Sequence, residues 1–220
     1  MITYQLVKAW KLFNAMGMPD EKLHVRQHKS DERAFYSSDT WDIEYLSEDY
    51  GRIELVGISD RSDYDLSAHQ NLSKQSMEIN KDGKKYVPHV IEAAFGVDRP
   101  FYCSLESTFI EEEGEKPRTY FKLPTDLAPY RAAVFPLVKK DGIPEKAREV
   151  FDLIKEAGYY AQWDKSGSIG RRYARADEVG IPFCITVDYD SLEDNTVTVR
   201  ERDSMEQKRV KIDELVKALK

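Results

Sequence analysis

The sequence predicts two domains of different class: an α+β domain with an antiparallel sheet, followed by an α/β domain with a mostly parallel sheet. In the first half, strand-like runs lie close together without regular crossover helices between them, which favours antiparallel pairing. In the second half, strand-like and helix-like segments alternate, as in α/β folds. A length of 220 residues is enough for one large domain or two modest ones.

The first half begins with apolar residues at helical spacing, and Gly17 marks the expected helix end. Trp41, Ile43 and Tyr45 then alternate with acidic residues, a pattern typical of a strand. The pair Asp82-Gly83 indicates a hairpin turn. The elements expected in this half are a helix at 3–16, strands within 23–59, a short polar helix at 60–69, a buried strand at 87–91 and a helix at 97–109 with Phe101, Tyr102, Leu105 and Phe109 on one face.

The segment from Glu111 to Pro117 resembles a linker, because a run of carboxylates before Gly and Pro favours a solvated loop. A second break follows at residues 123–129, and we place the domain boundary near residue 126. The predicted domains are therefore 1–126 and 127–220.

In the second half, Pro144 in a first helical turn and Gly158 and Gly180 at helix ends follow the usual preferences for helix termini. The expected elements are strands at 132–138, 159–163, 183–187 and 196–201, and helices at 144–157, 169–179 and 212–219.

Composition excludes several classes of protein. The net charge is −7, and residues 127–220 carry 17 basic and 17 acidic residues, so the whole excess of acid lies in residues 1–126. This argues against nucleic-acid binding by bulk charge but permits a local basic patch in the second domain. Cys103 and Cys184 stand alone and predict neither a disulfide framework nor a zinc site. With no signal peptide and no membrane-length apolar run, we expect a soluble, cytosolic protein.

The stretch from Ser166 to Arg175 is the most suggestive local motif. Small residues precede a helix whose free N–H groups suit an anion, and Arg171, Arg172 and Arg175 decorate its first turns. One interpretation is contact with a nucleic-acid backbone. The other is a solvated arginine face that pairs with Asp177 and Glu178, and the residues alone leave both open.

The stretch from Glu92 to Arg99 is a second candidate site: a strand ends in a carboxylate, turns through Gly96 and enters a helix that carries Arg99. Glu92 suits an ammonium and Arg99 a phosphate or an adenine face. The residues alone favour the plainer interpretation, a helix start with surface ion pairs. They likewise favour a solvent-facing Glu54, and the four histidines show no metal-binding spacing.

Several stretches together resemble glycyl-tRNA synthetases of the archaeal/eukaryotic type, in the order found in that family. The matching stretches are Arg26–His28, Gly51–Ile58, Asp60–Ser67, Val90–Arg99, Leu127–Tyr130, Ser166–Gly180 and Arg202–Met205. The resemblance covers essentially the whole chain, but only the C-terminal portion of such an enzyme: part of a class II catalytic domain, then an anticodon-binding domain.

The resemblance implies a glycine–tRNA ligase that uses ATP and Mg²⁺, and it assigns site residues. Val90–Arg99 would be class II motif 3. Its catalytic residues would be Arg99, which binds ATP, and Glu92, which binds the glycine ammonium. The implied ATP-binding residues are Glu54, Leu55, Gly96, Val97, Asp98 and Arg99, and Glu54 is also suited to the metal. The implied glycine-binding residues are Glu92, Ala93, Ala94, Phe95 and Gly96. The implied tRNA-binding residues are Arg171, Arg172 and Arg175.

The chain also departs from the family pattern. Ala94 stands where the family has a serine whose hydroxyl helps to place the glycine ammonium, and Pro100 follows Arg99. Motif 1, a dimer contact, and motif 2, which supplies an arginine to the α-phosphate, precede the region that this chain covers. An insertion that some members carry after the helix at 60–69 is replaced by a short turn at 71–86.

Three functions compete at this stage. The first is a part of a glycine–tRNA ligase that binds tRNA(Gly), glycine and ATP. Such a chain would be inactive alone and would work with the N-terminal catalytic portion of the enzyme, and it could form a homodimer. The second is a non-catalytic accessory protein that binds tRNA. The third is a protein-interaction module.

Overall fold

The computed structural model describes residues 1–114 and 117–220, and its contacts divide the chain into two units, Met1–Ser107 and Thr108–Lys220. The division precedes the domain boundary that we predicted at residue 126. Residues 108–126 thus belong structurally with the second unit. Each unit is described by itself.

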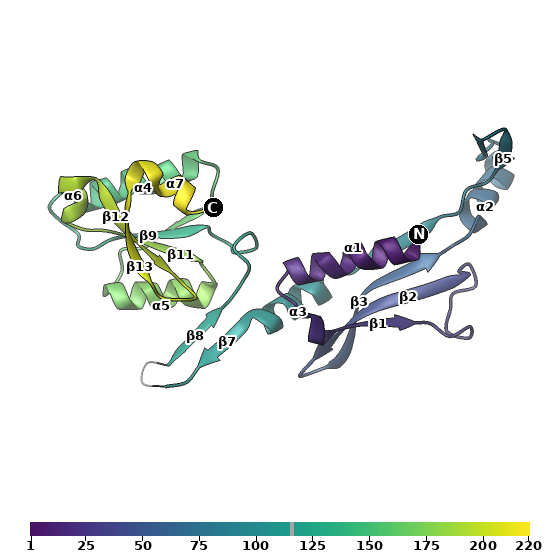
Figure 1. Ribbon diagram of the computed structural model, residues 1–220, viewed down its shortest axis with the longest axis horizontal. Coiled ribbons are helices and arrows are strands. Elements are labelled where there is room, and N and C mark those ends of the chain that lie inside the picture. Colours follow the sequence, from purple (N-terminus) through teal and green to yellow (C-terminus); the bar gives the residue numbers. More distant parts are fainter. Residues whose placement is uncertain (115–116) are drawn as a thin grey trace. The chain divides into compact units, whose positions relative to one another are not determined.

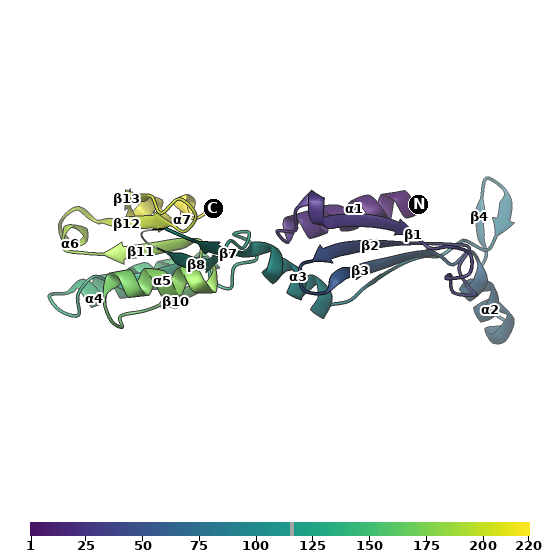
Figure 2. The ribbon, with the colours of Figure 1, turned by 90° about the horizontal axis from the view of Figure 1, so that it is seen from below.

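The first unit is a four-stranded sheet with one long helix on one of its faces (Figures 1 and 2). Its strand order is β1-β2-β3-β6 and all pairings are antiparallel, which confirms the predicted antiparallel sheet. A small hairpin, β4–β5, turns at Asp82-Gly83 as expected. The elements are α1 (Ile2–Ala15), a 3-10 turn (Asp20–Lys22), β1 (Leu23–Gln27), β2 (Asp39–Ser47), β3 (Gly51–Asp60), α2 (Tyr64–Ser73), β4 (Ile79–Lys81), β5 (Lys84–Tyr86), β6 (Ile91–Phe95) and α3 (Asp98–Thr108).

The two faces of this sheet differ in chemistry because side chains alternate along each strand. The face under α1 is apolar, and its core consists of Ala9, Phe13, Met18, Leu23, Ile43, Tyr45, Leu55, Val56, Ile58 and Cys103. A bulge in β3 leaves Leu55 without a partner, so that Glu44 pairs with Glu54 and Ile43 with Val56. Leu55 and Val56 therefore both enter the core, and Glu54 lies on the opposite, polar face.

Two local predictions in this unit were wrong. We expected a buried strand at 87–91, but β6 begins only at Ile91, since Pro88 cannot donate a ladder hydrogen bond. We expected Phe101, Tyr102, Leu105 and Phe109 on one face of a helix at 97–109, but α3 ends at Thr108 and Phe109 begins β7 (Phe109–Glu112). Phe101 is 63% exposed, whereas the small residues Cys103 and Ser104 are buried. The Ser104 hydroxyl donates to the carbonyl of Met16 at 2.6 Å, which ties α3 to the end of α1.

The second unit is a five-stranded sheet with helices on both faces (Figure 1). Its strand order is β10-β9-β11-β12-β13. The elements are β7 (Phe109–Glu112), β8 (Arg118–Phe121), β9 (Ala132–Pro136), α4 (Ile143–Glu156), β10 (Ala161–Trp163), α5 (Ile169–Val179), β11 (Phe183–Val187), α6 (Asp190–Asp194), β12 (Thr196–Glu201), β13 (Gln207–Lys211), a 3-10 turn (Ile212–Glu214) and α7 (Leu215–Ala218).

This sheet is mixed rather than mostly parallel. Strand β9 pairs in parallel with β10 and β11, whereas β11–β12 and β12–β13 are antiparallel. Strand β13 was not predicted, because four of its five residues are exposed and it lacks an apolar alternation. The prediction of α5 and β11 was correct to the residue.

Only the first two residues of the segment expected to be a solvated linker lie in a strand. Glu111 and Glu112 lie in β7 and pair with Thr119 and Arg118 of β8, while residues 115 and 116 of the predicted linker lie outside the described residues. The Glu112 carboxylate accepts from the Arg118 guanidinium at 3.0 and 3.1 Å, so this charge is neutralised in the hairpin.

A buried network of charges joins this hairpin to α5 and β12. Asp177, only 1% exposed, accepts from Arg200 at 2.8 and 2.9 Å and from Arg118 at 3.4 Å. Arg202, also buried, donates to the carbonyls of Gly180 and Leu123 at 2.8 and 2.9 Å. The hairpin and helix α5 are thus held by several buried charged hydrogen bonds, each of which is costly to leave unmade.

Gly180 offers a sharp test of this packing. Its φ is +83°, and a Cβ there would lie 2.9 Å from Leu123 Cδ1 and 3.1 Å from the Phe121 carbonyl. We expect Gly180→Ala to destabilise the second unit by about 1–3 kcal/mol, from backbone strain and crowding together. Hydrogen exchange of peptides from this unit at increasing denaturant measures the loss.

Gly158→Ala is the matched control, because its φ is +87° and no atom lies within 4 Å of the added Cβ. It reports backbone strain alone. Equal losses in the two variants would mean that the close approach of the hairpin contributes nothing.

Candidate functional site

The polar face of the first unit's sheet gathers charged side chains from neighbouring strands. Asp42 and Glu44 project from β2, and their side chains are only 5% and 11% exposed. Glu54 lies on β3 beside Glu44, and the Oε1 atom of Glu54 is 3.4 Å from where a Cβ of Gly57 would stand. Gly57 thus lies on the same face as the Glu54 and Asp42 carboxylates.

The buried carboxylates are balanced by cations. Asp42 contacts His28 Nε2 and Arg26 Nη1, the latter at 3.5 Å, and Glu44 accepts from Arg52 Nη1 at 3.0 Å. Sequence reasoning recognised the strand at Trp41–Tyr45 but did not assign its acidic residues to a site. Their alternation with apolar residues also fits an ordinary half-exposed strand, so that signal does not discriminate.

Glu54 and Arg99, which lie 45 residues apart in the chain, meet in an open cavity of about 400 Å³. Arg99 Nη1 donates to the Glu54 carbonyl at 3.1 Å and lies 3.6 Å from its carboxylate. Both side chains remain about half exposed, at 59% and 52%. The cavity is lined by Glu44, Tyr50, Arg52, Ile53, Glu54 and Arg99. Acidic and basic groups together at an exposed site suit a ligand with phosphates and a bound cation.

Leu55, expected beside ATP, does not share this face. Its side chain is 1% exposed and belongs to the core under α1. It is not among the residues that line the cavity.

The residues expected to bind glycine divide between the two faces of β6. Glu92 and Ala94 pair with Ser59 and Gly57 and lie on the polar face. Phe95 points to the opposite face, where its ring lies 6.1 Å from that of Phe13. Ala93 shares the face of Phe95 by alternation. Gly96, Val97 and Asp98 follow at the exposed start of α3.

Glu92 already has a partner. Its carboxylate accepts from Arg61 Nη1 at 3.0 Å, and the Arg61 guanidinium also binds Asp65 and stacks 3.9 Å over the Tyr36 ring. The hydrogen bonds to Asp65, which have the larger effect, and to Glu92 raise the pKa of Arg61. Because Ser59, opposite Glu92, is five residues along β3 from Glu54, Glu92 and Glu54 stand roughly 15 Å apart on this face.

A preformed metal cage is not seen here: the described residues contain no group of three or more His, Cys, Asp or Glu side chains placed to hold an ion. Magnesium, however, is commonly held by one or two carboxylates together with substrate phosphates. Glu54, with Glu44 opposite it, fits that arrangement.

In the second unit, the three arginines expected to contact tRNA have different environments. Arg171 is exposed in the first turn of α5. Arg175 binds Asp164 Oδ2 through Nε at 3.0 Å and donates to the Ser166 carbonyl at 2.7 Å. Burial acts to raise the pKa of Asp164, but the Ser166 N–H and Arg175 outweigh it, and the pKa lies below its ordinary value.

Arg172 does not fit the predicted role. Its side chain is buried, donates to the carbonyls of Pro136 and Gly167 at 2.6 and 2.9 Å, and fastens the start of α5 to β9. Burial lowers its pKa. Nor do these arginines pair with Asp177 as the alternative interpretation expected, since Asp177 binds Arg200 and Arg118.

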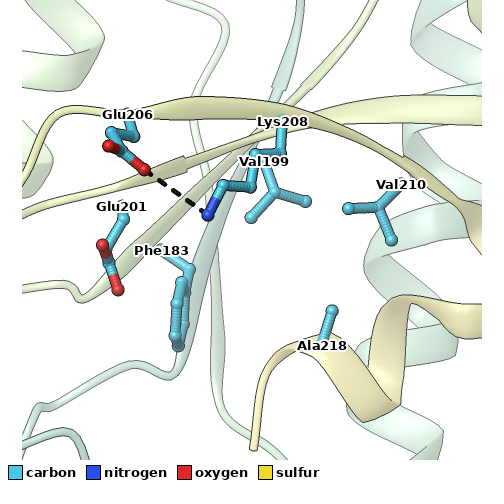
Figure 3. Close-up of a pocket in the computed structure, with 7 residues that line it drawn as sticks. All are labelled: Phe183, Val199, Glu201, Glu206, Lys208, Val210 and Ala218. Carbon is cyan, nitrogen blue, oxygen red and sulfur yellow. Dashed lines mark ion pairs between the residues drawn. The ribbon is translucent and has the colours of Figure 1, made fainter.

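A second cavity, of about 160 Å³, lies between α7 and the ends of β11, β12 and β13 (Figure 3). Val199, Val210 and Phe183 converge on it with Ala218 below, and Glu206 pairs with Lys208 at 3.4 Å on its rim. Glu201 adds a further carboxylate to this mouth. With Glu206 paired to Lys208, the Glu201 carboxylate at the mouth disfavours a phosphate in this cavity.

Comparisons with known proteins give a family match within the second unit and relatives that match nearly the whole chain. Residues 131–220 fit the model of the anticodon binding domain family. A glycine–tRNA ligase of Clostridium tetani is 45% identical over 95% of this chain, and that of Methanocaldococcus jannaschii is 38% identical over 100% of it. The chain is similar to glycine–tRNA ligases along nearly its whole length. The anticodon-binding match lies within this similarity, at residues 131–220.

The chain spans about half the length of these relatives: 45% of the Clostridium tetani protein and 52% of the Methanocaldococcus jannaschii protein. The alignment with the latter extends over 300 positions, so that relative carries residues with no counterpart among the 220 here. A solved prolyl-tRNA synthetase from Cryptosporidium parvum superimposes with a TM-score of 0.65 over 94% of this chain and 43% of its own. At 18% identity that likeness establishes the class II synthetase fold alone.

In the described residues, no helix is both long and apolar enough to cross a membrane.

Proposed function

We propose that this chain is the C-terminal portion of a glycine–tRNA ligase, in which residues 1–126 complete part of the site for ATP, Mg²⁺ and glycine and residues 127–220 bind tRNA(Gly). The observation that carries the proposal is the combination of near full-length similarity to glycine–tRNA ligases with the Glu54–Arg99 cavity on the sheet's polar face.

In this proposal, Arg99 binds the phosphates or the adenine face of ATP, and Glu54 holds the metal that bridges the phosphates. Adenylate formation accumulates negative charge on the α-phosphate, which fixed cations stabilise. Glu92 and Ala94, on the same face, border the glycine pocket. Glycine has no side chain to hold, so such a pocket must capture its ammonium and exclude larger amino acids by size.

For tRNA, the carboxyl edge of the parallel strands β9, β10 and β11 is the favoured surface, since ligands of α/β sheets bind at that edge. Exposed cations follow these strands: Lys139 after β9, Lys165 after β10 and Arg171 at the start of α5. The second domain has equal numbers of acidic and basic residues, but these can be distributed unevenly over its surface. A local basic patch is therefore consistent with its zero net charge.

The test of the proposal is aminoacylation with the N-terminal catalytic portion supplied. By this term we mean the part of a glycine–tRNA ligase, such as the Clostridium tetani relative, that precedes the region spanned by this chain. The chain alone should not charge tRNA(Gly), and the chain with this portion, joined or mixed, should. No charging by a folded combination would overturn the proposal.

Arg171→Ala should weaken binding of tRNA(Gly) and reduce the slope of log affinity against log salt by about 1, the expected loss of one phosphate contact. Titration of labelled tRNA(Gly) at several salt concentrations measures both quantities. Arg148→Ala is the control, because Arg148 is an exposed arginine of α4 that pairs with Asp152. An equal effect of the two substitutions would contradict a contact specific to α5.

A specific observation favours a second function, that of a non-catalytic tRNA-binding accessory protein. Ala94 offers no hydroxyl on the polar face and Arg61 already binds Glu92, so glycine capture by these residues is weakened. In this case the chain would bind tRNA but not ATP. Protection of Arg99 from arginine-directed modification by ATP would argue against it.

A further inference from the structure

An exposed cluster of three aromatic rings lies at the end of the first unit that carries α2. Phe35 and Tyr36 come from the loop between β1 and β2, and Tyr64 is the first residue of α2. The ring centre of Phe35 lies 5.3 Å from that of Tyr36 and 5.6 Å from that of Tyr64, both in edge-on contacts. Phe35 is 85% exposed and Tyr64 is 46% exposed. The two tyrosines thus hold the Phe35 ring in place while its face stays open to a planar group.

Arg61 connects this cluster to the proposed glycine site. Its guanidinium carbon lies 3.9 Å from the centre of the Tyr36 ring, and its Nη1 donates to the Glu92 carboxylate at 3.0 Å. Glu54 lies near the start of β3, whereas Arg61 follows the end of that strand. The aromatic cluster is therefore next to Glu92 and on the far side of it from the cavity that we assign to ATP.

The segment that follows α2 adds exposed positive charge at the same end of the unit (Figures 1 and 2). Residues 71–86 include the hairpin β4–β5, which is fastened to α2 because the Met77 N–H donates to Gln70 Oε1 at 2.8 Å. The segment has only two acidic residues against four exposed lysines, which are Lys74, Lys81, Lys84 and Lys85. None of the four pairs with a carboxylate in the part of the chain that the structure describes. This is a local excess of basic charge in a domain, 1–126, that has 16 basic and 23 acidic residues.

An open aromatic ring beside unpaired lysines suits a single-stranded nucleic acid. Such strands are bound by stacking of their bases on aromatic side chains and by contact of their phosphates with cations. A base-paired duplex could use the lysines but not the rings, because its base faces are stacked on one another. In the charging of a tRNA, the glycyl group passes to the ribose at the unpaired 3′ end. That end must therefore approach the glycine site at Glu92, beside which the aromatic cluster lies.

We infer that this surface, made of the Phe35–Tyr36–Tyr64 cluster and the lysines of residues 71–86, binds the unpaired 3′ end of tRNA(Gly). One base stacks on Phe35 and the lysines contact the phosphates beside it. The inference rests on the proposed function and adds to it a second RNA contact, in the first unit, besides the one that we assign to α5.

The test titrates the intact chain with two labelled RNAs: complete tRNA(Gly), and the same tRNA without its unpaired 3′-terminal nucleotides. Phe35→Ala should weaken binding of the complete tRNA about tenfold, the effect of losing one stacked base, and leave binding of the shortened tRNA unchanged. Because Phe35 is 85% exposed, the substitution should leave the fold intact. Tyr160→Ala is the matched control, at a 79% exposed aromatic residue of the second unit, and should change neither affinity.

The lysines are tested through salt dependence. Joint replacement of Lys81, Lys84 and Lys85 by Gln should reduce the slope of log affinity against log salt for the complete tRNA by about 2, at roughly 0.7 for each phosphate contact on a single strand. The slope for the shortened tRNA should stay the same. Lys8→Gln with Lys11→Gln, at exposed positions of α1, is the control and should leave both slopes unchanged.

Arg171→Ala separates this inference from the proposed function, since it should weaken binding of both RNAs. If it does so while Phe35→Ala affects neither RNA, or both equally, the inference is overturned and the proposed function stands. Failure of the unsubstituted chain to bind either RNA would count against both. If Phe35→Ala changes the sedimentation of the chain but not its affinity for tRNA, the aromatic cluster is a protein contact, and the inference is again overturned.

Discussion

Asp177→Ala should destabilise the second unit by about 3–5 kcal/mol, the usual effect of removing one member of a buried ion pair. Asp177 is 1% exposed and accepts from Arg200 at 2.8 and 2.9 Å, with Arg118 a further 3.4 Å contact. The substitution leaves the Arg200 guanidinium, 7% exposed, without its carboxylate in a region that water does not reach. Such an uncompensated charge costs more than the lost hydrogen bonds alone.

The measurement is hydrogen exchange of peptides from residues 117–220 in increasing denaturant, since the chain has two units and a single unfolding transition is not assured. Asp152→Ala is the control: it removes an exposed carboxylate that pairs with Arg148 at 3.3 Å on α4, and should cost at most about 0.5 kcal/mol. Asp177→Asn keeps the shape and should lie between the two. A loss below about 1 kcal/mol for Asp177→Ala would show that Arg118 and Arg200 find other partners.

This network also shows what could not be predicted from the sequence. Arg118, Asp177 and Arg200 are spread over 83 residues of chain, and nothing in their spacing signals that they meet. Arg172 is a similar case. It is the same residue type as its neighbour Arg171, yet Arg172 is buried against β9 and Arg171 is exposed. Which face of α5 packs on the sheet decides the role of each arginine, and that depends on tertiary contacts.

Elements with a strong apolar period were predictable. Helix α5 ends at a glycine with positive φ, and β11 is an apolar run interrupted only by Thr186, so both had clear local signals. The hairpin β7–β8 had the opposite signal, because its carboxylates resemble a solvated loop until Arg118 is placed beside Glu112. The bulge at Leu55 is likewise invisible in sequence, although it decides that Glu54 shares a face with Glu44 and Gly57.

The Glu54–Arg99 pair was predictable only through the resemblance to a family. From the residues alone, Arg99 fitted an ordinary surface ion pair and Glu54 a solvent-facing strand residue. The structure adds the placement: both side chains line one cavity and stay about half exposed. A pair kept open on a polar sheet face, rather than buried for stability, is what a ligand-binding role requires.

Arg99→Ala should reduce glycine-dependent ATP–pyrophosphate exchange by about 10²–10³-fold when the N-terminal catalytic portion is supplied, the usual cost of removing one charge-stabilising group. Arg99 touches the Glu54 carbonyl at 3.1 Å and is 59% exposed, so its loss should leave the fold intact. Arg99→Lys keeps the charge but loses the planar guanidinium and should recover only part of the rate. Binding of tRNA(Gly), which we assign to the other unit, should not change.

Those separate readouts distinguish a local role from a structural one. If Arg99→Ala also weakened tRNA binding or altered the circular dichroism spectrum, the residue would be supporting the fold. If neither Arg99→Ala nor the control Arg148→Ala, on α4 of the second unit, reduced ATP–pyrophosphate exchange, Arg99 would not contact ATP. Loss of exchange with normal tRNA affinity is the outcome that fits a cation placed on the nucleotide, because Arg99 and the exposed cations of α5 belong to different units of the chain.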